Sequence, residues 1–284
     1  MAAIGFQGRA ELLRYDSKSG QFQPYLPGVW ADELDFSKDG QWLTYVGWPD
    51  GSLWRCKRDG SDRLQLVPRG STMPRWSPDG KQIVFARWMP DNQMAICVIS
   101  KEGGAPQQLV SNVAVAIDPV WSPDGNELAF GADPWLQFSK IDIKIFNFAG
   151  RTIRTLSGSE ELYRPRWSPN GRYLAAVSRD AQTLMMFDFK ERKWMELAKT
   201  TINGPEWSRD STYIYFDNYP VQKESAIMRL RLADHKIERV LSLTNLRRPD
   251  IPARPRFCID PDGAPVVARD TGNQEIYALD LELP

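Results

Sequence analysis

Short apolar stretches separated by polar turns recur along the whole chain, and they predict strands. An apolar segment of four or five residues follows each of six turns; these segments are Trp42–Val46, Ile83–Ala86, Leu128–Gly131, Tyr173–Val177, Tyr213–Phe216 and Pro265–Ala268. No stretch of a dozen residues shows a convincing helical period. Both faces of these segments are apolar, as expected for strands covered on both sides. The pattern predicts an all-β fold.

One short motif precedes each of these strands. It consists of an aromatic residue, serine, a variable residue, aspartate or asparagine, and glycine; the copies are Phe36–Gly40, Trp76–Gly80, Trp121–Gly125, Trp167–Gly171 and Trp207–Ser211. A sixth copy, Asp260–Gly263, follows Phe257 after two extra residues. The copies recur every 40 to 50 residues, which matches one four-stranded blade per repeat. We therefore predict a six-bladed β-propeller of antiparallel blades.

The motif has the chemistry of a hairpin turn. Proline presets φ at the second position, aspartate tolerates the third, and glycine accepts the left-handed conformation of the fourth. Ser211 occupies that glycine position in the fifth copy. A left-handed serine costs on the order of 1–2 kcal/mol, so we expect this turn to differ locally.

Further strands are expected to complete each blade. The third strands are Leu53–Cys56, Ala95–Ile99, Ile141–Phe148, Leu184–Phe189, Ala226–Leu232 and Glu275–Leu281. Units one to five also contain a fourth strand, whereas the sixth does not. We predict that Gln21–Leu26 supplies it and closes the ring, so that residues 1–284 form one domain and residues 1–26 complete its last blade. Alternatively, Ala3–Phe6 and Leu12–Tyr15 belong to a further blade of a larger propeller.

The motif also carries a family resemblance. Pro-x-Trp-Ser-Pro-Asp-Gly followed by an apolar strand resembles the repeat of TolB-type bacterial propellers, which are relatives of the WD40 repeat family, and it extends from Asp35 to about Asp280. The segments Ser52–Arg55, Arg63–Leu66 and Gln274–Asp280 resemble C-terminal propellers of winged-helix regulators and protein kinases. The resemblance implies a sensing or protein-binding module. It transfers no binding residues, because the shared motif is structural.

Charge and composition narrow the classes of partner. Lysine plus arginine equals aspartate plus glutamate at 36 each, so the chain lacks the basic excess typical of nucleic-acid binders. The first residues contain neither a signal peptide nor a membrane-spanning run, and we expect no membrane association. The three cysteines are widely spaced and are expected to be unpaired thiols. A cytoplasmic and a periplasmic location both stay open, and we expect a monomer.

The residues needed for catalysis or metal binding are scarce. His235 is the only histidine and lies in a predicted surface turn, so a histidine-rich metal site is excluded. The Gly-x-Ser-x-Gly motif of many serine hydrolases is absent, as are phosphate-binding glycine motifs. We expect no catalytic residues, no metal and no cofactor, and therefore no enzymatic activity.

Repeat symmetry places one residue per unit around the channel, immediately before the aromatic residue. These positions are Asp35, Arg75, Val120, Arg166, Glu206 and Arg256. One interpretation is a rim that binds an acidic ligand or a partner's carboxylate through arginine. The other is ion pairing between blades, which we favour.

Two loops after second strands contain aromatic residues that could contact a partner. They carry Trp88 in one loop, and Trp135 and Phe138 in the other. Exposed aromatic side chains are frequent interface hot spots, but these could equally fold under their own loops.

The sequence thus favours a non-catalytic propeller that binds a protein or small ligand on its channel face, within a larger bacterial signalling or regulatory protein. A propeller that gates a separate prolyl-oligopeptidase-like hydrolase domain is one alternative. A periplasmic TolB-like interaction protein is another.

Overall fold

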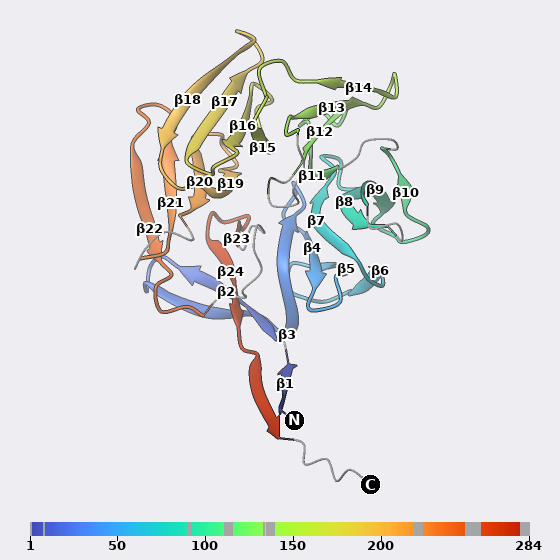
Figure 1. Cartoon of the computed structure of the whole chain (residues 1–284), viewed down its shortest axis with the longest axis vertical. Helices are drawn as coiled ribbons and strands as arrows, with labels where there is room; N and C mark the ends of the chain where they lie inside the picture. Colours follow the sequence, from blue (N-terminus) through green and yellow to red (C-terminus); the bar gives the residue numbers. More distant parts are fainter. Residues whose placement is uncertain are drawn as a thin grey trace.

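The computed structural model is a ring of antiparallel β-sheets with a two-stranded extension (Figure 1). It describes residues 2–7, 9–89, 93–110, 116–132, 134, 140–218, 224–247 and 257–278. Among these residues there is no α-helix, and none of the described segments is a helix that could span a membrane.

Four sheets are separate four-stranded blades in which the strands pair in chain order. The first contains β7 (Ser71–Trp76), β8 (Gln82–Trp88), β9 (Met94–Ser100) and β10 (Gln107–Gln108). The second contains β11 (Ile117–Trp121), β12 (Glu127–Gly131), β13 (Lys144–Asn147) and β14 (Thr152–Thr155). The third contains β15 (Leu162–Trp167), β16 (Tyr173–Ser178), β17 (Thr183–Asp188) and β18 (Lys193–Lys199). The fourth contains β19 (Asn203–Trp207), β20 (Tyr213–Asp217), β21 (Ala226–Arg231) and β22 (Ile237–Ser242).

A seven-stranded sheet completes the ring, in the order β23-β24-β2-β3-β4-β5-β6. Its strands are β23 (Phe257–Ile259), β24 (Pro265–Asp270), β2 (Ala10–Asp16), β3 (Gln21–Phe36), β4 (Trp42–Gly47), β5 (Ser52–Lys57) and β6 (Leu64–Val67). The first part of β3 pairs with β2, and its last part, from Ala31 to Phe36, pairs with β4.

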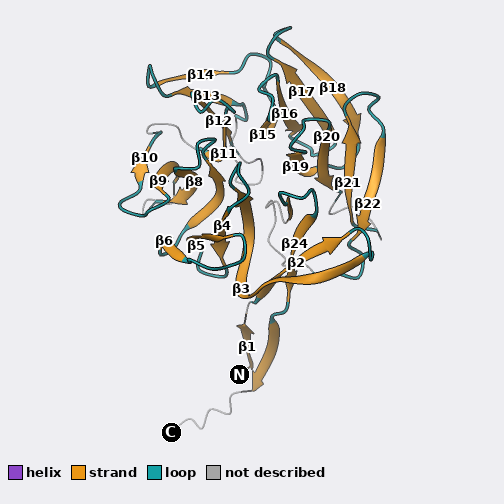
Figure 2. Ribbon diagram, turned by 180° about the vertical axis from the view of Figure 1, so that it is seen from behind, coloured by secondary structure: helices purple, strands orange, loops and turns teal. Residues whose placement is uncertain are grey.

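The prediction of six separate blades is therefore corrected to four. The strands expected for the other two blades share one sheet, because the 16 residues of β3 run without interruption from one group of strands into the other. The innermost strands nevertheless follow one another around the channel. β3, β7, β11, β15, β19 and β23 contact each other in succession, and β23 contacts β3. Seen from behind, β3, β11, β15 and β19 lie around the centre of the ring (Figure 2).

Two assignments near the chain ends are also corrected. The segment Glu275–Leu281 was expected to be the third strand of the last unit, but β2 occupies that place beside β24. Instead β25 (Asn273–Ala278) pairs with β1 (Ala2–Gln7) in a two-stranded sheet that extends away from the ring (Figure 1). β2 is thus committed to the last group of strands, which removes the reason to assign Leu12–Tyr15 to a further blade.

The repeated turns are held by the motif residues themselves. In five copies the serine hydroxyl donates to the Asp or Asn two residues later at 2.5–2.7 Å, and it accepts a backbone N–H from the next strand. Ser211 keeps the same turn with φ of 61°, so the expected local difference is not found. Its hydroxyl accepts the N–H of Asn170 from the neighbouring blade at 3.1 Å, which helps to offset the strain.

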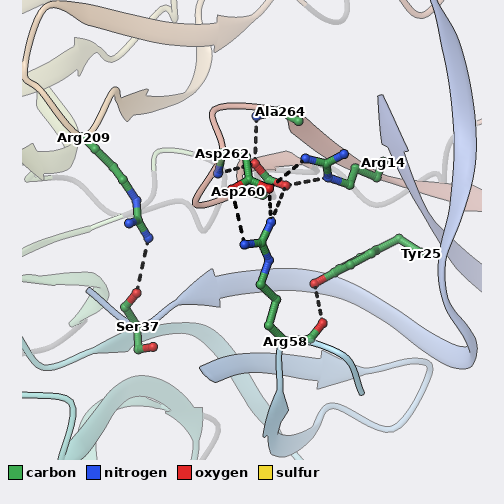
Figure 3. A network of polar contacts seen from close by, with 8 residues as sticks. All are labelled: Arg14, Tyr25, Ser37, Arg58, Arg209, Asp260, Asp262 and Ala264. Carbon is green, nitrogen blue, oxygen red and sulfur yellow. Dashed lines mark hydrogen bonds and ion pairs between the residues drawn. The ribbon is translucent and has the colours of Figure 1, made fainter. Parts of the chain in front are cut away.

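The sixth turn differs, because Asp260 replaces the serine. Its Oδ1 accepts the backbone N–H groups of Asp262 and Ala264, and its Oδ2 accepts from Arg14 Nε at 2.6 Å and Arg58 Nη2 at 3.4 Å (Figure 3). Both arginines also pair with Asp262. We call Arg14, Arg58, Asp260 and Asp262 the seam cluster, because it joins β2, the turn after β5 and the β23–β24 turn.

Candidate functional site

A cavity of about 440 Å³ lies at the centre of the ring, within the usual size range of ligand pockets. Five of the six positions that the repeat places around the channel contribute to its wall: Asp35, Arg75, Val120, Arg166 and Glu206. The sixth, Arg256, lies outside the described residues. The repeat therefore brings five of the six ring side chains to one site.

The strand register identifies the residues that the last unit contributes to the cavity wall. Ile259 pairs with Pro265 directly before the turn, as Trp76 pairs with Ile83 in the first separate blade. Ile259 is thus the counterpart of the motif tryptophan, and Cys258 takes the ring position; both line the cavity. The sequence alignment used Phe257 as the reference and so missed Cys258. Counting residues back from the turn would have found it.

The charged wall residues form a continuous ion-pair network. Arg75 Nη2 lies 2.5 Å from Glu206 Oε1, and Arg75 Nη1 lies 3.4 Å from Asp35 Oδ1. Arg166 Nε donates to the same Glu206 oxygen at 3.2 Å, and its Nη1 lies 2.7 Å from Asp118 Oδ1. The favoured interpretation, ion pairing between blades, accordingly describes the contacts present in the structure. Glu206 is the shared acceptor that links both arginines.

Burial perturbs the protonation of this network. Desolvation raises the pKa of Asp35 to about 6, although Arg75 and the N–H of Trp76 act in the opposite direction. Burial opposes the charge on Arg75, but Glu206 and Asp35 more than offset it, so its pKa is raised. Burial also raises the pKa of the Cys258 thiol well above its ordinary value, and the neighbouring carboxylates add to this effect. That thiol therefore stays protonated and is a weak nucleophile at neutral pH.

Several buried polar atoms of the site have no hydrogen-bond partner in the structure. They are Arg75 Nε, Arg166 Nη2, Trp76 Nε1 and Asp118 Oδ2. A buried polar atom without a partner costs about 1–3 kcal/mol. Three of these four atoms are donors, so the site has more capacity to donate hydrogen bonds than to accept them.

The innermost strands carry a strained backbone position that sequence reasoning missed. In each separate blade, the residue before the proline that lies two positions ahead of the motif tryptophan has positive φ and coincides with a shift in strand register. These residues are Met73, Asp118, Arg164 and Gly204. The non-glycine members cost on the order of 1–3 kcal/mol each. The bulge brings Asp118 against Arg166, with both side chains 2% exposed. Apart from Gly204, the residues at the bulge are not of a type that would predict it from the sequence, so only the structure reveals the bulge.

Two of the motif tryptophans hold neighbouring innermost strands together. The indole N–H of Trp207 donates to the carbonyl of Arg166 at 2.9 Å, and that of Trp121 donates to the carbonyl of Arg75 at 3.3 Å. Each bond runs from one blade to the ring residue of the preceding blade. Trp121 and Trp207 are thus structural, and they fix the backbone that carries Arg75 and Arg166.

The cavity mouth is bordered by the second residue of the turns. Three turns contribute Pro78, Pro123 and Pro169, whereas two contribute Lys38 and Arg209. Both cationic residues are exposed.

The predicted loop contacts are only partly described. Trp88 is 43% exposed at the end of β8, so it is available to a partner. Trp135 and Phe138 lie outside the described residues. His235 has a φ of 56° in an exposed turn, and within the described part of the chain no three histidine, cysteine or acidic side chains cluster as a metal site would need.

Comparison with known proteins agrees with the architecture. A family model for the TolB beta propeller domain matches residues 33–242. A TolB candidate protein from Agrobacterium tumefaciens superimposes with a TM-score of 0.73 and 17% identity, covering 93% of this chain and 99% of that one. TolB from Acinetobacter baumannii gives a TM-score of 0.66 with 15% identity over 81% of this chain and 62% of its own. At these identities the likeness concerns the fold.

One curated relative is an uncharacterized peptidase, YuxL, from Bacillus subtilis. It is 32% identical over 76 residues, which amount to 27% of this chain. The match spans only 12% of the peptidase, so it concerns a small part of that protein.

Proposed function

Because this chain belongs to the TolB beta-propeller domain family, we propose that it is a non-catalytic module that binds a partner at the mouth of its central channel. The observation that carries this proposal is the charged cavity, whose wall receives one ring residue from each of five repeats. The network there is paired and buried, which suits recognition better than bond-making chemistry. Among the described wall residues, no activated nucleophile lies beside a general base.

The wider context is part of the same proposal. We infer that the module serves a larger bacterial signalling or regulatory protein, in keeping with the resemblance of its segments to C-terminal propellers. We also infer that the seven-stranded sheet acts as two blades, so that the ring counts six. The contacts between successive innermost strands support this count, because six such strands return to the first.

Site-specific photocrosslinking tests the binding face. A photoreactive phenylalanine analogue at Pro123, which lines the cavity mouth, is compared with the same analogue at Arg154 on the exposed outermost strand β14. We expect discrete crosslinked products from position 123 in the native host, and their loss when Pro169→Trp narrows the mouth. Equal crosslinking at both positions, or insensitivity to Pro169→Trp, would contradict the proposal.

A second candidate is a gating propeller of a separate hydrolase domain, favoured by the partial match to a peptidase. The two candidates differ in what lies beside the propeller in the native protein. If the crosslinked species is a covalently attached or co-purifying hydrolase domain whose substrate range widens when the mouth is enlarged, the gating function is correct. Ester or peptide turnover by the purified propeller itself would refute the non-catalytic assignment.

A further inference from the structure

The turns at the cavity mouth depart from their own repeat on one side. Lys38 and Arg209 stand where the four other turns have proline, and so give up the restriction of φ that proline provides. Departures from a structural repeat without an evident gain in stability are expected at functional positions. These two departures are therefore the first place to look for ligand recognition.

The two cations lie on the same side of the mouth. Arg209 Nη2 is 3.5 Å from the carbonyl oxygen of Ser37, the residue next to Lys38 (Figure 3). The guanidinium thus passes beside the turn of the first unit, where it also lies 3.4 Å from the position a Cβ would take at Gly40. Positive charge is concentrated here at the entrance, while the proline-bearing turns border the rest.

The described cavity wall as a whole, mouth included, has a surplus of positive charge. It carries four cationic side chains, Lys38, Arg75, Arg166 and Arg209, against the carboxylates of Asp35 and Glu206. Because these two carboxylates balance Arg75 and Arg166, the surplus comes from the two cations at the mouth. Asp118 lies behind Arg166, outside the cavity wall, and reduces the surplus to one positive charge.

Two arginines of the wall also have unused hydrogen-bonding capacity. Arg166 is 2% exposed and its buried Nη2 has no partner in the structure, and Arg75 has a buried Nε without one. Both guanidinium groups line the cavity, and a carboxylate is the group that pairs with a guanidinium through charge-assisted hydrogen bonds.

We propose that the channel ligand is acidic, and that it enters between Lys38 and Arg209 and places a carboxylate against Arg75 and Arg166. This inference rests on the proposed binding function and specifies its ligand chemistry. Glu206, which accepts from both arginines, is the internal competitor that the ligand carboxylate replaces. The carboxylate can come from a small organic acid or from an acidic side chain of a partner.

Calorimetric titration of the full chain at constant ionic strength tests the proposal. The probes are citrate, a hexaglutamate peptide with blocked ends, and hexalysine as the charge-reversed peptide. Lys38→Gln/Arg209→Gln is compared with Lys81→Gln/Lys199→Gln, a pair with the same net charge whose lysines are 78% and 73% exposed outside the cavity. We expect the mouth variant to weaken acid binding about tenfold and the control pair to change it less than twofold.

The outcomes distinguish a small acid from an acidic partner segment, and they show which results refute the proposal. Binding of citrate supports a small acid, and binding of hexaglutamate alone supports an acidic partner segment. Hexalysine binding as tight as either acid, absence of binding by both acids, or unchanged binding in the mouth variant overturns the proposal. If acid binding fails while crosslinking at Pro123 persists, the channel function stands and only its acid preference is refuted. Unfolding midpoints of both variants verify that each is folded.

Discussion

Replacing Asp260 by asparagine is expected to lower the free energy of unfolding by about 2–3 kcal/mol. The side chain is 2% exposed, and its Oδ2 accepts charge-assisted bonds from Arg14 and Arg58. Such bonds contribute about 1.5–3 kcal/mol each when buried. The two arginines are 31% and 35% exposed and keep Asp262 as a partner, so solvent and the second carboxylate recover part of the loss. An amide at this position can still accept the two backbone N–H groups through its oxygen, so the variant isolates the charge.

Asp262→Asn is the matched control. Its carboxylate contacts the same two arginines but is 57% exposed, and exposed pairs contribute about 0–1 kcal/mol. Both variants can be measured by urea unfolding followed through tryptophan fluorescence, with equal denaturant dependence as the condition for comparison. A double-mutant cycle with Arg14→Gln should give a coupling of at least about 1 kcal/mol to Asp260. Equal effects of Asp260→Asn and Asp262→Asn would refute the reasoning that burial gives the seam cluster its strength.

Two further predictions concern the channel. The raised pKa of Asp35, about 6 against an ordinary 3.8, means that its contribution to stability is present below pH 4 and is lost as pH rises through 6. The stability of the wild type relative to Asp35→Asn should therefore fall by about 1 kcal/mol between pH 5 and pH 7, as measured by urea unfolding at each pH; a rise with pH would contradict the burial argument. Trp207→Phe should cost about 2–3 kcal/mol, because it leaves the buried carbonyl of Arg166 without its indole donor. Trp167→Phe, whose indole bond to Gly171 is 3.4 Å long, should cost about 1 kcal/mol less in the same assay, and equal losses would count against the hydrogen bond.

The repeat made most of the architecture predictable. A motif that combines a turn with a preceding aromatic residue locates the first and second strands of each unit, because its spacing and its turn chemistry are both local. The ring positions followed from the same symmetry, and five of them line one cavity. The predictions that were wrong concerned strand pairing between distant segments of the chain. The place of β2 beside β24, and the continuity of β3 through two groups of strands, are decided by contacts between residues far apart in sequence.

At the candidate site, too, local sequence predicted some residues and missed those that depend on strand register. Arg75 and Arg166 were identified by position, but Asp118 was not, because a bulge moves it into contact with Arg166 and the sequence of the motif does not encode that shift. Cys258 was missed for a related reason. The last hairpin was aligned on its aromatic residue, whereas the backbone register is determined by the turn.

The pairing of β2 with β24 determines how the ring responds to tension. Ala10 and Asp270 face each other at the end of this pair from which the chain continues into β1 and β25. A pulling force applied through the two ends of the chain therefore acts on one hydrogen-bonded pair at a time, after the β1–β25 ribbon has separated. This peeling geometry resists far less than shearing all pairs at once. Under such a force the ring is therefore expected to open between β2 and β24.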